Sequence, residues 1–291
     1  MNEKTLNTLP VWGEKTLLMG ILNITPDSFS GDGLISKDAM QQAVLTQAQV
    51  FVDGGADILD IGGESTRPGA AIVSAQEELD RVVPVLEWLK EAELDVILSV
   101  DTYKAAVADA ALQAGAHWVN DVWGLRADPD MAGVVAKANA PVVLMHNRSQ
   151  PQQVEVRERL GGSYGGAEYN DLLQDVCDDL MQSVQLAHNA GIPDEHIILD
   201  PGIGFGKTVE QNLQLIKHLD RIRVLGYPVL MGPSRKSFIG YTLDLPVDQR
   251  FEGSASAVVV GMMQGADIIR VHDVAQMARV IKMTDAIMRV N

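Results

Sequence analysis

The chain has 291 residues, 46% of them hydrophobic, and a formal net charge of −16 at pH 7. Such a charge argues against nucleic acid as a partner, because the phosphates would be repelled, and it makes any cluster of basic residues informative. The length suits a single α/β barrel domain, which usually takes about 250 residues, and a core of that size needs no disulfide or structural metal to fold.

Eight short apolar runs, bounded by Gly, Asp, Asn or Pro, alternate with amphipathic stretches, as is typical of buried parallel strands. In chain order the expected strands are Leu17–Ile24, Asp57–Ile61, Val96–Val100, Trp118–Asn120, Val142–Met145, Ile197–Leu199, Val229–Met231 and Ile268–Val271. The stretches between them carry apolar residues at helical spacing, as in Met40, Val44 and Phe51. Eight unbroken β–α alternations predict the α/β class and a single (β/α)8 TIM barrel over residues 1–291, with its core at about 17–290.

Local signals mark several boundaries of these elements. Gly54 and Gly115 each follow a helical run, where a left-handed cap residue is expected. Pro84 lies inside a helical pattern, and either a kink or the first turn of a helix fits it. Residues 147–170 are polar and carry four glycines, and we interpret them as a mobile surface insertion after the fifth strand.

Polar side chains follow every one of the expected strands. The carboxyl ends of the strands form the active-site rim in barrels of this kind. The rim would carry Asn23, Thr25–Phe29, Gly62–Gly69, Asp101, Asn120, His146, Asp200, Ser234–Ser237, Arg270 and His272. A lone Asp at a strand end is more often a turn or cap residue, but eight polar strand ends with basic residues among them predict a binding site.

The residue types at this rim indicate the chemistry of the ligand. Asp101, Asn120 and Asp200 offer acceptors and one amide, which match a flat heterocycle with several N–H donors, such as an aminopyrimidinone. Arg270 and His272 lie two residues apart, face the same side of a strand and could hold phosphate oxygens. Arg270 could instead pair with a structural acid, and His272 could cap a helix.

Two other site types are rejected on spacing. Gly202–Thr208 looks like a nucleotide loop, but a P-loop needs glycine where this chain has Pro201, and the Rossmann spacing also fails. A zinc site is not indicated, because the sequence has neither an H-x-x-x-H pair nor a cysteine cluster.

The lone cysteine, Cys177, excludes a disulfide within the chain and is typical of a reducing compartment. We interpret Cys177 as a partly buried apolar residue, because no cationic neighbour activates its thiol. The first 16 residues lack the apolar core of a signal peptide, and no run approaches the ~20 residues of a membrane span. We therefore expect a cytoplasmic protein without a membrane partner.

Two long segments resemble the signatures of the dihydropteroate synthases. Residues 19–30, Met-Gly-Ile-Leu-Asn-Ile-Thr-Pro-Asp-Ser-Phe-Ser, are similar to the first signature, and residues 60–69, Asp-Ile-Gly-Gly-Glu-Ser-Thr-Arg-Pro-Gly, to the second. Shorter matches follow in the family's order: Ser99–Thr102, Asn120–Asp121, Asp200–Phe205, Ser234–Lys236 and Arg270–Val274. The sequence departs from the family pattern at Ser30–Gly33, at His146–Arg148 and at Gly253–Ser256, none of which belongs to the expected pterin pocket.

The resemblance implies a transferase of folate biosynthesis. Such enzymes condense 6-hydroxymethyl-7,8-dihydropterin diphosphate with p-aminobenzoate and release pyrophosphate, with diphosphate loss to a pterin cation as the first step. The resemblance also implies a Mg2+ cofactor held by Asn23, sulfonamides as inhibitors and a homodimer.

Matched position by position, the family's site falls on residues of this chain. The pterin would contact Asp101, Asn120, Asp200 and Lys236, with Met145 and Phe205 as apolar walls. Arg270 and His272 would hold the phosphates. Thr66, Arg67 and Pro68, together with Thr25–Phe29, would be mobile loops that close the p-aminobenzoate pocket with Ser237. The catalytic set would be Arg67, Asp101, Lys236, Arg270 and His272.

Two rival functions have less support. A pterin-binding methyltransferase shares the barrel and the pterin-holding acids, but the cobalamin motif D-x-H-x-x-G is missing from this sequence. A barrel that binds pterin or a partner protein without catalysis would be separated from an enzyme by a turnover assay.

Overall fold

The computed structural model describes residues 9–24, 36–65, 70, 72–149, 154–157, 160–164 and 166–290. Eight parallel strands form a nearly closed barrel in the order β8-β5-β4-β3-β2-β1-β10-β9, and a bridge between Leu199 and Val229 joins the two edges. The strands are β1 Leu17–Asn23, β2 Ile58–Gly62, β3 Ile97–Asp101, β4 Trp118–Asp121, β5 Val142–Met145, β8 Ile197–Asp200, β9 Leu230–Met231 and β10 Ile268–Val271. Each differs from its predicted range by at most one residue at either end, and the predicted TIM barrel is confirmed.

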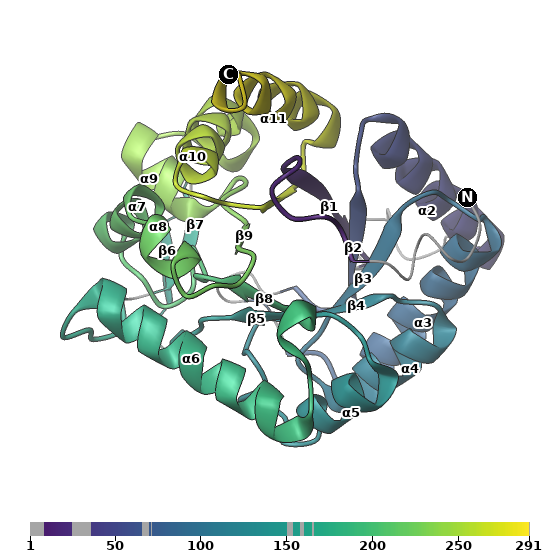
Figure 1. Cartoon of the computed structure of the whole chain (residues 1–291). Helices are drawn as coiled ribbons and strands as arrows, with labels where there is room; N and C mark the ends of the chain where they lie inside the picture. The colour runs from purple at the N-terminus through teal and green to yellow at the C-terminus, as the bar shows by residue number, and fades with distance from the viewer. Residues whose placement is uncertain are drawn as a thin grey trace.

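Helices form a ring outside the strands (Figure 1). They are α2 Lys37–Asp53, α3 Ala75–Glu91, α4 Ala105–Ala114, α5 Met131–Ala138, α6 Leu172–Ala190, α7 Val209–Lys217, α8 Asp220–Arg223, α9 Ser237–Leu243, α10 Phe251–Met263 and α11 Val274–Met288, with 3-10 turns at Asp194–His196 and Val247–Gln249. Of the helices in the described ranges, none is long and apolar enough to cross a membrane.

The backbone tests two local predictions, the place of Pro84 within its helix and the left-handed glycine caps. Pro84 lies well inside α3, which excludes the first-turn alternative. The prediction of a left-handed cap at Gly54 is wrong, because its φ is −74° and the positive φ of +98° belongs to Gly55. Gly115 has the expected positive φ, at +123°. The turn after α2 therefore ends one residue later than the sequence pattern indicated.

Side chains alternate along each strand between the barrel interior and the helix layer. The barrel interior nearer the amino ends of the strands is apolar and consists of Leu17, Met19, Ile58, Trp118, Val143, Ile198, Leu230 and Ile268. Two residues further along four of these strands, the inward position becomes polar, at Asp60, Asn120, Asp200 and Arg270. The period of two thus places an apolar floor beneath a polar layer at the carboxyl ends of the strands.

The insertion after β5 contains two strands that the sequence interpretation did not include. Strands β6 (Val154–Arg157) and β7 (Gly161–Tyr164) pair antiparallel. The turn between them is held from the barrel side, because Arg250 Nη2 donates to Leu160 O at 2.9 Å and Tyr241 Oη donates to Gly161 O at 3.2 Å. The insertion is therefore attached to the helices that follow β9.

Candidate active site

A cluster of opposite charges occupies the polar layer of the barrel. Arg270 on β10 donates from Nε to Asp60 Oδ2 and from Nη2 to Asp101 Oδ2, both at 2.6 Å. Asn120 Nδ2 also donates to Asp60 Oδ2, at 2.9 Å. Arg270 thus pairs with two acids in this structure.

Asp60 was not assigned a role from the sequence, although it lies at the centre of this cluster. It is fully buried, and its second oxygen, Oδ1, has no hydrogen-bond partner among the described residues. A buried acceptor without a donor is costly, so a ligand N–H group or an ordered water would stabilise this oxygen. The available signal was a single carboxylate within the otherwise apolar strand Ile58–Ile61.

Burial sets the ionisation of the groups around this cluster. It raises the pKa of Asp101 to about 7, with Arg270 opposing the rise and Asp60 adding to it. Burial also raises the pKa of Asp200, against the attraction of Lys236. For Arg270, burial disfavours the charged form, but Asp60 and Asp101 outweigh it and raise the pKa. The acids therefore offer poorly hydrated acceptors, which bind N–H donors more strongly than exposed ones do.

Lys236 reaches the pocket from the start of α9. Its Nζ donates to Ile203 O and lies 4.6 Å from the centre of the Phe205 ring. Burial lowers the pKa of Lys236 to about 8. Asp200 Oδ1 accepts from Gly202 N at 2.7 Å, so the residues after β8 bend back over the strand end.

Apolar side chains stand beside these polar groups. Met145, Phe205 and Val122 form a small buried cluster against which Trp123 and Tyr103 pack. The structure thus brings the predicted residues Met145 and Phe205 together as one wall. A flat ring could contact this wall with its face while its edge meets the acids.

The remaining predicted residues of β10 and α9 lie at the same rim. His272 Nδ1 is 3.1 Å from Ser234 Oγ, which also accepts from His272 N at 3.2 Å. The turn that carries Lys236 is fixed by Arg235, which pairs with Asp273. Ser237 follows Lys236 as the first residue of α9.

Asn23 is the residue that the resemblance implies as the Mg2+ ligand. It ends β1 opposite Gly62, which in turn lies opposite Asp101. A Cβ at Gly62 would lie 3.6 Å from Asn23 Oδ1 and 3.7 Å from Asp101 Oδ2, so both oxygens border one small space. Oxygen ligands suit Mg2+, which commonly takes one or two from the protein and the rest from water and phosphate. Within the described ranges there is no group of three or more His, Cys, Asp and Glu placed to hold a metal.

The predicted loop residues Thr66, Arg67 and Pro68, and the segment Thr25–Phe29, lie outside the described residues. The residues just before the second loop are tightly held, because Lys104 pairs with both Glu64 and Glu78.

Desolvated acids beside an apolar wall suit a flat, hydrogen-bonding heterocycle. Residues 19–272 match the family model described as pterin binding enzyme. The dihydropteroate synthase of Clostridium beijerinckii is 49% identical over 278 residues, which cover 95% of this chain and 96% of that protein. The dihydropteroate synthase of Bacillus subtilis is 52% identical over 275 residues, or 94% of this chain and 90% of that protein.

Solved structures give the same result. The dihydropteroate synthase of Clostridium difficile, determined in the presence of pteroic acid, has a TM-score of 0.87 and 44% identity, and the match covers 97% of this chain and 100% of that chain. The Xanthomonas albilineans enzyme in complex with 7,8-dihydropteroate has a TM-score of 0.82 and 38% identity, with 96% and 95% covered. The chain belongs to the pterin-binding enzymes and, within them, to the dihydropteroate synthases, which are transferases of folate biosynthesis.

Proposed function

We propose that the polar layer of this barrel binds 6-hydroxymethyl-7,8-dihydropterin diphosphate and joins it to p-aminobenzoate, with loss of diphosphate before the new bond forms. The observation that carries the proposal is the group of buried acceptors Asp101, Asn120 and Asp200 in the polar layer of the barrel. A relative solved with 4-aminobenzoic acid supports this substrate here, and one solved with 7,8-dihydropteroate supports the product.

The pterin edge would meet Asp101, Asn120 and Asp200, which accept from its N–H groups, while Lys236 donates to the ring carbonyl or a ring nitrogen. Met145 and Phe205 would contact the ring faces. Because these acids are poorly hydrated, they also stabilise positive charge that develops on the pterin.

The leaving group would be held at the rim beside Asp101. The bond between the pterin methylene carbon and the diphosphate oxygen breaks, and its electron pair leaves with pyrophosphate. Arg270 and His272 would bind the departing phosphates, and Asn23 would hold Mg2+, which neutralises charge on that group. Asp60 and Asp101 engage Nε and Nη2 of Arg270, so Nη1 is the nitrogen that these carboxylates leave for a phosphate.

The amine then attacks the methylene carbon, forms the C–N bond and loses a proton. A weak aniline nucleophile suffices for a cation, so the reaction needs no activated nucleophile from the protein. Thr66, Arg67 and Pro68, with Thr25–Phe29 and Ser237, would close the p-aminobenzoate pocket and exclude water, which would otherwise capture the cation. We propose that sulfonamides compete for this pocket, and a Yersinia pestis relative solved in complex with a sulfonamide drug supports this.

We further propose a single-domain, cytoplasmic enzyme that forms a homodimer. The support for a dimer is a set of exposed apolar side chains on α10 and α11: Val260, Met263, Met283, Ile287 and Met288. Exposed apolar groups concentrated in this way mark interaction surfaces. Light scattering after gel filtration would test the dimer, and a Met283→Glu and Ile287→Glu double variant should shift the mass to that of a monomer.

The decisive experiment is pyrophosphate release from the dihydropterin diphosphate in Mg2+, with and without p-aminobenzoate. We expect release coupled to 7,8-dihydropteroate when both substrates are present, and slower release when p-aminobenzoate is omitted. Binding of the pterin without any release would contradict catalysis and leave the non-catalytic barrel. Release that depends strictly on p-aminobenzoate would contradict the dissociative order.

A further inference from the structure

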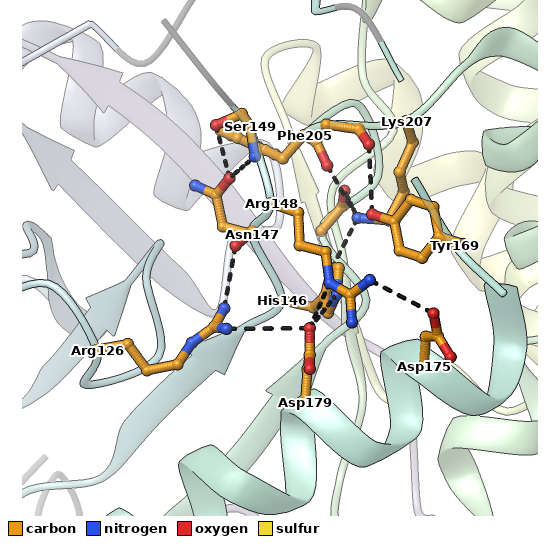
Figure 2. Close-up of polar contacts among 12 residues, drawn as sticks. Arg126, His146, Asn147, Arg148, Ser149, Tyr169, Asp175, Asp179, Phe205 and Lys207 are labelled. Carbon is orange, nitrogen blue, oxygen red and sulfur yellow. Dashed lines mark hydrogen bonds and ion pairs between the residues drawn. The ribbon is translucent and has the colours of Figure 1, made fainter. Parts of the chain in front are cut away.

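The proposed mechanism gives no role to Lys207, although this lysine is buried beside the pterin pocket, with 3% of its surface exposed. Its Nζ lies 3.0 Å from Gly202 O, 3.0 Å from Phe205 O and 2.9 Å from His146 Nδ1 (Figure 2). Burial lowers the pKa of Lys207 well below its ordinary value, but its ammonium form has three protons to donate, and these three acceptors match them. Lys207 therefore holds Gly202 and Phe205, the two ends of the segment 202–205, beside His146, which follows β5.

His146 connects this lysine to an acid on α6. Its Nε2 lies 3.1 Å from Asp179 Oδ2, which also accepts from Arg148 Nε at 2.7 Å (Figure 2). When Lys207 is an ammonium group, Nδ1 accepts from it, so the ring is neutral and its proton is on Nε2, which donates to Asp179. Burial, followed by the charge of Lys207, lowers the pKa of His146 to about 4, which agrees with a neutral ring.

The backbone between Gly202 and Lys207 is packed so closely against its neighbours that a Cβ at Gly202 or Gly204 would clash with them. Gly202 has φ +68°, and a Cβ there would lie 1.8 Å from His146 O. Gly204 has φ +88°, and a Cβ there would lie 2.8 Å from Lys236 Cδ. The glycines that resembled a nucleotide loop thus let the chain pass between the end of β5 and the Lys236 side chain.

This segment in turn contacts Lys236 at two points, through Ile203 O and the Phe205 ring. Lys207 binds the carbonyl of Gly202, which directly precedes Ile203, and the carbonyl of Phe205. If either carbonyl changed direction, the backbone beside it would rotate. The rotation would move Ile203 O or the Phe205 ring relative to Lys236.

We infer that Lys207 is a positioning residue of the pterin pocket: with His146 and Asp179 behind it, it fixes the segment 202–205 so that Ile203 O and the Phe205 ring hold Lys236. The inference rests on the pterin-binding roles proposed above for Asp200, Phe205 and Lys236. Its charge has a second effect at the same site, because Lys207 helps to offset the burial that raises the pKa of Asp200. Lys207 thus acts on Lys236 through the segment 202–205 and on Asp200 through its charge.

The test is Lys207→Met, which keeps the length of the side chain and removes its three donors. We expect the KM for the dihydropterin diphosphate to rise at least about tenfold, as for a lost charge-assisted network, while the KM for p-aminobenzoate changes less than about twofold. The control is Lys217→Met, the same substitution at an exposed position in α7, which should change neither constant. A Lys207→Met enzyme that is less heat-stable but has both KM values unchanged, or has both raised equally, would overturn the inference.

A second comparison keeps Lys207 and changes its partner, and it decides the matter if Lys207→Met does not fold. His146→Asn retains an oxygen acceptor close to the position of Nδ1, whereas His146→Leu retains none. We expect His146→Leu to raise the KM for the pterin substrate by several-fold more than His146→Asn; equal values would overturn the inference.

Binding of pteroic acid to Asp200→Asn is measured by calorimetry in parallel with Lys207→Met. The comparison distinguishes failure of the proposed pterin site from failure of the role of Lys207. An unchanged affinity in Asp200→Asn would remove the pterin site proposed above. Weaker binding in Asp200→Asn together with wild-type binding in Lys207→Met would remove only the role of Lys207.

Discussion

The neutral state of His146 predicts how the stability of the protein depends on pH. Its side chain is fully buried, and its folded-state pKa of about 4 lies below the ordinary 6.5. As the pH falls from 7.5, the unfolded chain takes up this proton and the folded chain does not, so stability falls until the pH reaches the folded-state pKa. At pH 5.5 an unfolded histidine is about nine-tenths protonated, which corresponds to a loss of about 1–1.5 kcal/mol relative to pH 7.5.

The assay is urea denaturation of the wild type and of His146→Asn at pH 7.5 and 5.5, both above the sequence pI of about 4.7. Asparagine does not titrate, so the drop in unfolding free energy between the two pH values should be about 1–1.5 kcal/mol smaller in the variant. Asp179 does not confound the difference, because Arg148 still favours its ionised form and pH 5.5 lies above the ordinary Asp value of 3.8. The same drop in both proteins would refute a histidine held neutral by burial and Lys207.

Three further substitutions test other parts of the site. Arg270→Ala should weaken binding of the dihydropterin diphosphate by at least about tenfold more than binding of a pterin without phosphates, and equal losses on calorimetry would count against its role. Arg67→Ala should mainly impair the p-aminobenzoate step; an unchanged Michaelis constant and rate would contradict this. Gly202→Ala should destabilise the fold by more than about 2 kcal/mol in thermal unfolding, because its Cβ would meet His146 O at 1.8 Å. The control is Gly226→Ala, with φ +97° and open space around the Cβ, which should cost only about 1 kcal/mol.

The strands and the rim were accessible from the sequence because both depend on short-range patterns. A buried parallel strand is a short apolar run, and its carboxyl end must lie at the rim once the barrel closes. Asp101, Asn120 and Asp200 could be placed in this way without knowing what each contacts. The roles that came from the resemblance needed signatures, since spacing alone does not assign a substrate atom to a side chain.

The pairing of charges was not accessible, because partners distant in sequence meet only in the fold. Arg270 and Asp60 are 210 residues apart, and Lys207 and His146 are 61 apart. Glu78 illustrates a different limit: its position four residues before the buried Val82 marks it as inward-facing, but only the structure shows Lys104 beside it. The hairpin β6–β7 was missed because its strands are short and its support comes from Arg250, far along the chain.

The distribution of charge inside the barrel bears on function as well. Lys207 is buried and Lys236 and Arg270 are half-buried in a protein with a net charge of −16, next to acids that are themselves desolvated. Replacing buried ion pairs by apolar residues of similar volume often leaves a protein as stable or makes it more stable. The layer directly below shows that this barrel accommodates such an apolar filling. Stability alone therefore does not account for the charged layer, and the binding of a polar, negatively charged substrate does.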